Sequence, residues 1–239
     1  MKILKLLKTI IFWTISLIGI FILTLSFYVL ITTIQEKLFL PQEYIIWTFN
    51  YPFSASFLIY EVYMIFGLFY ALNKSFRKFI LFNLKKSFIK KYRKPFLSTF
   101  IILNIILIYT ILFNVTVITN NRIIDYTFLS PKGNEFNFND IIKIDAGVYG
   151  KKTQFPYSHY SMGEFYYIIQ LNDGTKIHFT DAVGTKDGED VRFLIEKLDI
   201  RYVNMDIPKV SSMDNFEFCT EHLDSIYTDK IRNILLNTK

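Results

Sequence analysis

Three histidines and two nearby serines are the residues of this chain best suited to catalysis or metal binding. The histidines, His159, His178 and His222, lack the close spacing, such as His-x-x-x-His, that zinc sites use. Ser158 and Ser161 flank His159, but no Gly-x-Ser-x-Gly elbow presents a serine as a nucleophile. The sequence therefore predicts no catalytic residue and no zinc site.

The cysteine and the acidic residues add no further chemistry. The one cysteine, Cys219, excludes an intramolecular disulfide, and we expect a small, half-buried side chain there. The acidic segment 181–190 offers the oxygen ligands that calcium prefers, but its acids do not follow the order of a calcium-binding loop. Asp187 or Asp190 is expected instead to cap a following helix. We therefore predict no metal, no cofactor and no enzymatic activity.

One acid, Glu61, lies in the middle of a long apolar run. Insertion scales put an acid at the centre of a membrane helix at roughly +2.5 to +3.5 kcal/mol, so Glu61 must be protonated, paired or turned towards other helices. The next apolar run carries Asn104 and Thr110. If the two runs are antiparallel helices, Glu61 lies between these residues in depth, and a protonated Glu61 can donate a hydrogen bond to Asn104. Glu61 is then either a polar clasp to a neighbouring helix or a proton- or ion-linked site.

The elements that carry these polar residues are three apolar runs, residues 10–34, 53–72 and 96–118. Each is close to the ~20 residues that cross a ~30 Å hydrocarbon core as a helix. The first is longer than the apolar core of a signal peptide, and no small-x-small cleavage site follows it. We therefore expect an integral membrane protein with three transmembrane helices, whose membrane domain is residues 1–118.

Basic residues gather in the loop 73–95, between the second and third runs, which contains no acid. Phenylalanines are interleaved with them, so the loop either contacts an anionic inner leaflet or acts only as a determinant of topology. The half of the chain after residue 118 carries more acids than bases, which argues against nucleic-acid binding. The basic residues of this loop are Lys74, Arg77, Lys78, Lys85, Lys86, Lys90, Lys91, Arg93 and Lys94.

The charge distribution also predicts the orientation. Lys and Arg next to membrane spans remain on the cytoplasmic side, so the N-terminus and the loop 73–95 are expected in the cytoplasm of a multi-pass cell-membrane protein. The domain after residue 118 is then extracytoplasmic. Tyr44, Trp47 and Tyr51 suit the headgroup layer, so we expect the segment 37–52 to lie along the outer membrane surface.

Residues 119–205 alternate between apolar and polar side chains, which is typical of half-buried strands. Asn172, Asp173 and Gly174 separate two such strands and predict a tight hairpin. The segment 190–200 has the apolar periodicity of a helix, and residues 206–239 form a separate helical tail. The expected fold class is three transmembrane helices followed by a mainly β, α+β domain.

Several segments of this domain resemble the bacterial pleckstrin-homology-like domains found on small multi-span membrane proteins. They are ITNNRIIDYTF, FNFNDIIKI and the hairpin YYIIQLNDGTKIHF, followed by a helix, within about residues 115–205. The resemblance implies a bent sheet closed by a capping helix, acting as a binding or assembly module without catalytic residues. Such domains are commonly cytoplasmic, whereas the charges of this chain predict an extracytoplasmic one.

Two functions are consistent with this organisation. In the first, a membrane-anchored protein binds or assembles with another membrane protein, a peptide or an envelope component through its outer domain. The aromatic loop containing Phe155, Tyr157, His159 and Tyr160 is the expected binding surface. In the second, the protein is an accessory subunit of a transporter or channel that uses the intramembrane Glu61.

Overall fold

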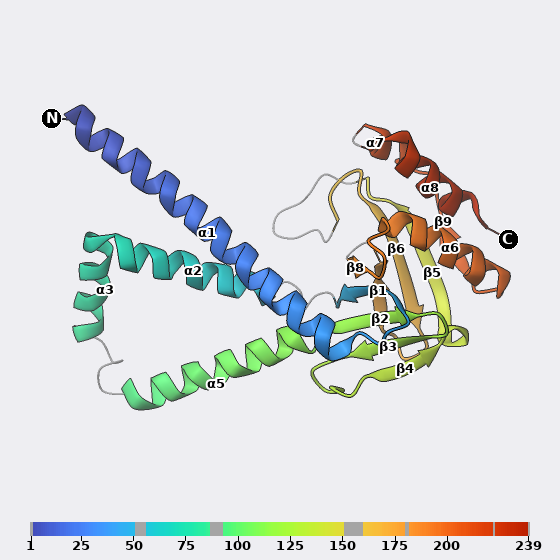
Figure 1. The fold of residues 1–239 in the computed structure, drawn as a ribbon, viewed down its shortest axis with the longest axis horizontal. Helices are drawn as coiled ribbons and strands as arrows, with labels where there is room; N and C mark the ends of the chain where they lie inside the picture. The colour runs from blue at the N-terminus through green and yellow to red at the C-terminus, as the bar shows by residue number, and fades with distance from the viewer. Residues whose placement is uncertain are drawn as a thin grey trace. The chain divides into compact units, whose positions relative to one another are not determined.

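The computed structural model describes residues 2–50, 56–86, 93–150, 160–179, 182–221 and 223–238 (Figure 1). The chain divides into two compact units. The helical unit comprises Met1–Leu38 and Pro52–Leu112, and the sheet unit comprises Phe39–Tyr51 and Phe113–Lys239. The chain therefore passes from one unit to the other at three places.

The helical unit has two helical segments that are long and apolar enough to cross a membrane, Ile10–Phe39 and Lys94–Leu112. A third apolar stretch, Leu58–Leu72, is shorter. Most side chains on the two longer segments are exposed, as expected for helices whose apolar surface meets lipid. The helices are α1 (Lys2–Phe39), α2 (Phe57–Leu72), α3 (Lys74–Lys86) and α5 (Arg93–Leu112).

Ring contacts join α1 to α2. Trp13 and Phe69 have ring centroids 5.0 Å apart, and Phe27 and Tyr60 are also 5.0 Å apart. Residue numbers rise along α1 as they fall along α2, so the two helices are antiparallel neighbours.

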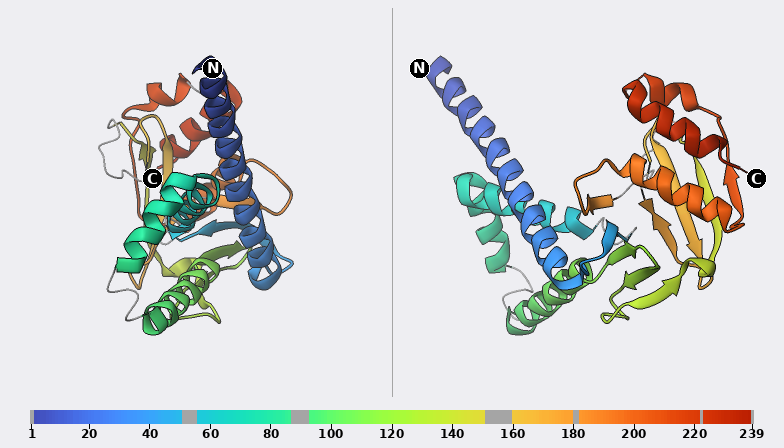
Figure 2. Two further views of the ribbon diagram at one scale, coloured as in Figure 1. Left: turned by 90° about the vertical axis from the view of Figure 1, so that its left-hand side faces the viewer. Right: turned by 45° about the vertical axis from the view of Figure 1, so that its right-hand side comes forward.

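Among the described residues, the sheet unit has two sheets together with the helices α6, α7 and α8. Figures 1 and 2 show these elements. The first sheet has the strand order β4-β3-β2-β1-β8, and the second has the order β7-β6-β5-β9. The strands of the first sheet are β1 (Tyr44–Phe49), β2 (Val115–Thr119), β3 (Arg122–Tyr126), β4 (Asn134–Asn137) and β8 (Ala182–Thr185). The other elements are a 3-10 turn (Phe138–Asp140), β5 (Ile141–Val148), β6 (Phe165–Leu171), β7 (Lys176–His178), α6 (Val191–Asn204), β9 (Lys209–Ser211), α7 (Phe216–Thr220) and α8 (Ser225–Leu236).

Alternating side chains of β6 build one core with residues from both sheets and from the helices. Tyr167 and Ile169 on this strand are fully buried. The predicted hairpin is confirmed, since Gly174 has a φ of +89°, a value that disfavours any side chain. The predicted helix is confirmed as α6, and Asp190 caps it by accepting a hydrogen bond from the Arg192 amide at 2.9 Å.

The third apolar run ends as a helix earlier than predicted. Helix α5 stops at Leu112, and Val115–Thr119 forms β2 instead of the last turn of a span reaching residue 118. The sequence VTVIT consists entirely of β-branched residues, which favour strands, and all five are buried. Apolar periodicity alone does not separate a buried strand from the end of an apolar helix.

The prediction that the segment 37–52 lies along a membrane surface is wrong for its described residues, 37–50; Tyr51 lies outside the described residues. Tyr44–Phe49 forms β1, an interior strand of the first sheet. Trp47 is 4% exposed, and its register partners are Val117 on β2 and Gly184 on β8. This packing explains the aromatic residues of β1, because a buried interior strand can be as rich in aromatic and apolar residues as a segment at a membrane surface.

The C-terminal tail also belongs to the sheet unit, whereas the sequence predicted a separate domain from residue 206. Strand β9 pairs in parallel with β5, with Ile144 opposite Lys209. Helix α8 packs against α6 and contributes Ile231 and Ile234 to the core. The unit therefore extends beyond the segment 119–205 at both ends.

Candidate functional site

Helices α2 and α5 are antiparallel, as expected, and their contacts fix the depth of Glu61. The Tyr60 hydroxyl donates a hydrogen bond to the Asn104 main-chain oxygen at 3.2 Å, and the Tyr63 and Phe100 rings are 5.9 Å apart. This register places Glu61 beside Asn104, on its Phe100 side, and not between Asn104 and Thr110 as predicted. Thr110 lies almost two helical turns further along α5, at about 1.5 Å per residue.

The predicted hydrogen bond from Glu61 to Asn104 does not form. The Asn104 side-chain amide donates to the Phe100 carbonyl at 2.8 Å, and the Thr110 hydroxyl donates to the Ile106 carbonyl at 2.9 Å, both within their own helix. Glu61 is half-buried, and no hydrogen bond or ion pair joins it to any other residue that the structure describes. Tyr60 therefore takes the bridging role that the sequence assigned to Glu61.

Gln35 is a buried polar residue that the sequence analysis missed. Its side-chain nitrogen donates to the carbonyls of Ile111 and Leu112 at 3.0 and 3.3 Å. These carbonyls belong to the last turn of α5, where helix geometry leaves main-chain oxygens without partners. Gln35 therefore ties the end of α1 to the end of α5. Because Gln35 directly follows the predicted span 10–34, a polar residue at that position is ordinary and does not indicate this role.

The basic segment between the apolar helices begins with a helix of its own. Asn73 ends α2, and its side-chain oxygen accepts hydrogen bonds from the Ser75 and Phe76 amides at the start of α3. Lys74 and Lys78 on α3 are exposed. Of the other predicted basic residues, Arg77, Lys85 and Lys86 continue α3, Arg93 and Lys94 begin α5, and Lys90 and Lys91 lie outside the described residues.

Helix α3 has apolar side chains on more than one side. Phe76 packs on Phe66 and Phe69 of α2, with ring centroids 6.2 and 6.0 Å away. Phe79 and Phe82 are 62% and 57% exposed. Exposed phenylalanines beside lysines whose stems reach outwards are typical of a helix lying in a membrane interface.

The predicted aromatic binding surface is seen in part. Phe155, Tyr157 and His159 lie outside the described residues, and only Tyr160 can be placed. Tyr160 is 7% exposed, and its hydroxyl lies 2.5 Å from Nδ1 of His178. Tyr160 also packs on the rings of Tyr149 and Tyr166, so its side chain is buried and is not an exposed ligand contact.

A polar cavity of about 220 Å³ opens in the sheet unit, at the end of the first sheet where β1 begins. Tyr44 is the register partner of Thr119 at this end, whereas Phe49 and Val115 lie at the opposite end, next to the helical unit in the sequence. Carboxylates predominate among its charged residues. The lining consists of Glu43, Tyr44, Ile45, Asn120, Lys186, Asp187, Glu189 and Leu194.

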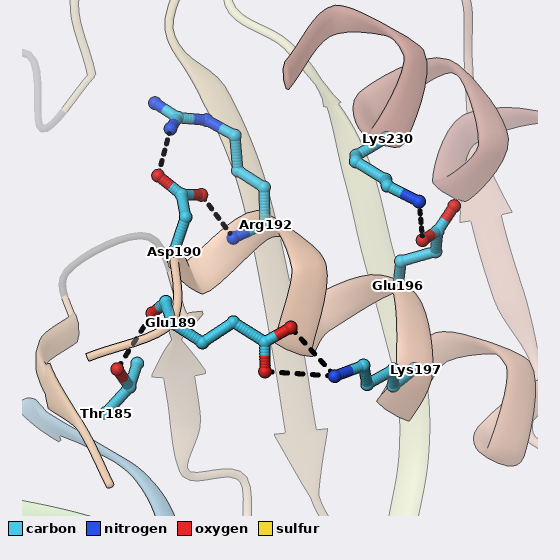
Figure 3. Close-up of polar contacts among 7 residues, drawn as sticks. All are labelled: Thr185, Glu189, Asp190, Arg192, Glu196, Lys197 and Lys230. Carbon is cyan, nitrogen blue, oxygen red and sulfur yellow. Dashed lines mark hydrogen bonds and ion pairs between the residues drawn. The ribbon is translucent and has the colours of Figure 1, made fainter. Parts of the chain in front are cut away.

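A network of charged residues fixes one wall of this cavity at the start of α6 (Figure 3). Both carboxylate oxygens of Glu189 accept from the Lys197 amine at 2.8 and 2.9 Å. The Thr185 hydroxyl donates to the Glu189 carbonyl at 2.8 Å, which joins β8 to the same turn. Glu189 is therefore partly neutralised, and Glu43 and Asp187 carry most of the negative charge that a ligand would meet.

A buried ion pair holds the C-terminal helix in place. Lys209 and Asp199 are 3% and 1% exposed at their side chains, and their charged atoms lie 2.6 Å apart. The second Asp199 oxygen accepts from the Asn237 amide at 2.7 Å, and the Tyr167 hydroxyl donates to Asp199 at 2.8 Å. Lys209 also donates to the Ile234 carbonyl at the end of α8. Burial lowers the pKa of Lys209, and the Asp199 carboxylate acts in the opposite direction.

A second buried carboxylate, Asp125, lies at the other end of the first sheet and is 3% exposed. It accepts hydrogen bonds from the Thr116 hydroxyl at 2.6 Å and from the Asn50 amide at 2.8 Å. Burial raises the pKa of Asp125, and the two hydrogen bonds act in the opposite direction. This network joins β1, β2 and β3 where the chain enters and leaves the helical unit.

No protein-family model, curated protein or solved structure matches this chain. In the described ranges, no group of three or more His, Cys, Asp or Glu side chains is arranged to hold a metal ion. The structure offers a polar cavity with a negative lining, two buried carboxylate networks that stiffen the sheet unit, and a half-buried acid on α2.

Proposed function

We propose that this protein is a multi-pass membrane protein that binds or assembles with a partner through its sheet unit. The observation that carries the proposal is the antiparallel pairing of β1 with β2. Paired strands must lie on the same side of a membrane, so the chain between Phe49 and Val115 has to return to the side that it left. If α5 crosses the membrane, α2 must cross it too, which makes three crossings with α1.

The orientation follows from the basic residues. The basic helix α3 connects α2 to α5, so it lies on the side opposite the sheet unit in a three-crossing arrangement. By the positive-inside rule, α3 and the N-terminus are cytoplasmic and the sheet unit is extracytoplasmic. The exposed Lys74, Lys78, Phe79 and Phe82 support a role for α3 in contacting the anionic inner leaflet.

Topology supports a pleckstrin-homology-like identity for the sheet unit. Strands β2-β3-β4 form one antiparallel meander, β5-β6-β7 form a second, and α6 follows them in the chain. A bent sheet with a helix after its strands is what the sequence resemblance implies. Strand β1 is an addition to that pattern, since it comes from the connection between the first two helices.

The partner of the sheet unit is inferred from the polar cavity. Glu43 and Asp187 give its mouth a negative charge that Lys186 only partly offsets. Complementary charge governs the selection of partners at such surfaces. We therefore infer that the cavity accepts a positively charged group, carried by a peptide, an envelope component or a neighbouring membrane protein.

The test compares proteins that co-purify with the full-length chain in mild detergent. The double variant Glu43→Gln/Asp187→Asn removes the negative charge at the cavity, and Glu217→Gln removes an exposed acid on α7, away from the cavity lining. We expect the double variant to lose a partner that both the unaltered protein and Glu217→Gln retain. An identical set of co-purifying proteins in all three samples would contradict binding at the cavity.

A second candidate function, an accessory subunit of a transporter or channel, rests on Glu61. A half-buried acid on an apolar helix is costly in hydrocarbon, and no residue in the described part of the chain pairs with it. A helix of a partner protein could supply that pairing. Under this function, Glu61→Gln abolishes activity although the protein accumulates normally. Under the binding function, Glu61→Gln is tolerated, because glutamine keeps the shape and the hydrogen bonding of the protonated acid.

A further inference from the structure

The most exposed large apolar side chain in the described part of the chain is Leu129, at the tip of the hairpin between β3 and β4. It is 89% exposed, and the neighbouring Phe128 is 40% exposed. Lys132 is the only charged residue of the loop 127–133. Of the acids that flank the loop, Asp125 is buried, and Glu135 is paired with Arg122 at 2.6 Å. The tip therefore presents apolar side chains and one cation.

Hydrogen bonds hold the tip in one shape. The Ser130 amide donates to the Thr127 carbonyl at 3.0 Å, and the Gly133 amide donates to the Ser130 carbonyl at 3.0 Å. Gly133 has a φ of +82°, and a Cβ there would meet the Ile124 side chain at 2.7 Å. Because much of its backbone is already hydrogen-bonded, the loop can enter an apolar layer at less cost than an open loop.

The base of the hairpin lies where the sheet unit joins the helices. Val115 and Tyr126 are register partners, and Leu112, the last residue of α5, is three residues before Val115. Leu129 is likewise three residues after Tyr126. Leu112 and Leu129 are therefore each three residues from the paired residues Val115 and Tyr126. Three extended residues span up to about 10 Å.

The last residue of α1 packs at the same end of the strands. Phe39, its last residue, packs on Tyr126 with ring centroids 4.7 Å apart and on Phe113 at 5.2 Å. The Tyr126 hydroxyl also donates to the Phe39 carbonyl at 3.5 Å. The hairpin loop thus follows Tyr126 at the end of the sheet where the chain joins α1 and α5, and not at the end with the polar cavity.

We propose that the tip of the β3–β4 hairpin inserts into the interfacial layer of the outer leaflet. Leu129 and Phe128 enter among the upper acyl chains, and the Lys132 amine lies at the lipid phosphates. The inference rests on the membrane anchoring in the proposed function and adds a further contact with lipid. A bilayer fits better than a protein partner, because the loop follows Tyr126 at the end of the sheet where the chain joins α5, and because it carries no acid to desolvate.

The test uses the full-length protein with Cys219→Ser in vesicles of phosphatidylcholine and phosphatidylglycerol. Single cysteines replace Leu129 at the tip, Asn121 in the β2–β3 turn at the other end of β3, and Leu103 in the middle of α5. Each carries an environment-sensitive fluorophore, and lipids bearing a nitroxide near the headgroup act as quenchers. Equal thermal midpoints for the three proteins establish that each one folds.

We expect the nitroxide lipids to remove most of the fluorescence at position 129 and to leave position 121 close to its value without quencher. A nitroxide placed deep in the acyl chain should quench position 103. If position 103 is quenched but 129 behaves like 121, the protein is anchored and hairpin insertion is wrong. If position 103 is not quenched either, the anchoring itself fails, and the inference fails with it.

Discussion

Trp47 and Val117 face each other across β1 and β2, although α2, α3 and α5 lie between them in the sequence. On its other side Trp47 meets Gly184 of β8, where a Cβ would lie 2.8 Å from the indole nitrogen. Strand β1 therefore fills an interior place in the first sheet that no other segment occupies. The residues after α5 therefore cannot form the complete first sheet by themselves, because β1 lies before α2 in the sequence.

The first prediction concerns this strand. The fragment 113–239 should fail to fold cooperatively, because it lacks β1 and leaves β2 and β8 without their shared neighbour. Joining residues 39–51 to its N-terminus through a flexible linker should restore a cooperative thermal transition and a β-sheet circular dichroism spectrum. A third fragment with residues 44–49 in scrambled order controls for length. Equal stability of all three fragments would refute an essential role for β1.

The second prediction concerns sidedness. Cys219 is 1% exposed, so it cannot report on accessibility, and it is replaced by serine in both test proteins. In intact cells, an impermeant thiol reagent should label Asn121→Cys in the sheet unit and should label Lys78→Cys on α3 only after permeabilisation. The physical reason is the retention of basic segments in the cytoplasm. The reverse labelling pattern would place the sheet unit in the cytoplasm.

The third prediction concerns the buried pair Lys209 and Asp199. Lys209→Met should lower the free energy of unfolding by roughly 3–5 kcal/mol, because it leaves a buried carboxylate without its cation. Lys209→Met/Asp199→Asn should recover part of that loss, since the asparagine carries no charge. Lys197→Met, at an exposed ion pair, should cost no more than about 1 kcal/mol. Urea unfolding in detergent, followed by circular dichroism, measures all three.

A small effect of Lys209→Met, similar to that of Lys197→Met, would mean that the pair is hydrated. The attachment of α8 would then rest on the apolar contacts of Ile231 and Ile234 and on the ion pair between Lys230 and Glu196.

The fourth prediction is a pH dependence due to Asp125. Burial raises the pKa of Asp125, so the folded protein binds this proton more tightly than the unfolded chain does. The contribution to stability is therefore greatest below the ordinary pKa of about 3.9 and is lost as the pH rises through the raised pKa. Asp125→Asn should therefore make the thermal midpoint depend less on pH above about pH 4.

The matched control for this experiment is Asp214→Asn, at an exposed acid in the same unit. It should leave the pH profile parallel to that of the unaltered protein. If Asp125→Asn also gives a parallel profile, the buried network does not shift the titration of Asp125.

Local signals in the sequence predicted the parts of the fold that depend on neighbouring residues. Gly174 marks a turn because only a few residues tolerate positive φ, and Asp190 marks a helix start because its side chain replaces a missing main-chain acceptor. Both signals lie within a few residues of the structure that they specify. The β6–β7 hairpin and α6 could therefore be predicted in both position and type.

Features that depend on distant residues could not be predicted in this way. The partners of Trp47 are found only after the chain has folded, and its aromatic neighbours equally fit a membrane surface. Asn104 was a plausible partner for Glu61 by depth, but its amide satisfies the Phe100 carbonyl in its own helix. The polar cavity is lined from separate segments of the chain, including Glu43, Asn120 and Asp187, so no sequence window contains it.

The position of β1 in the chain sets an order of events during synthesis. Strand β1 leaves the ribosome before α2, α3 and α5, whereas its partners β2 and β8 are made after them. The first sheet cannot close while those helices are still being made, and β1 must wait with both edges unpaired. The closing of the first sheet is therefore a late step in biogenesis, reached only when α2, α3 and α5 have been made and Val115 can pair with Phe49.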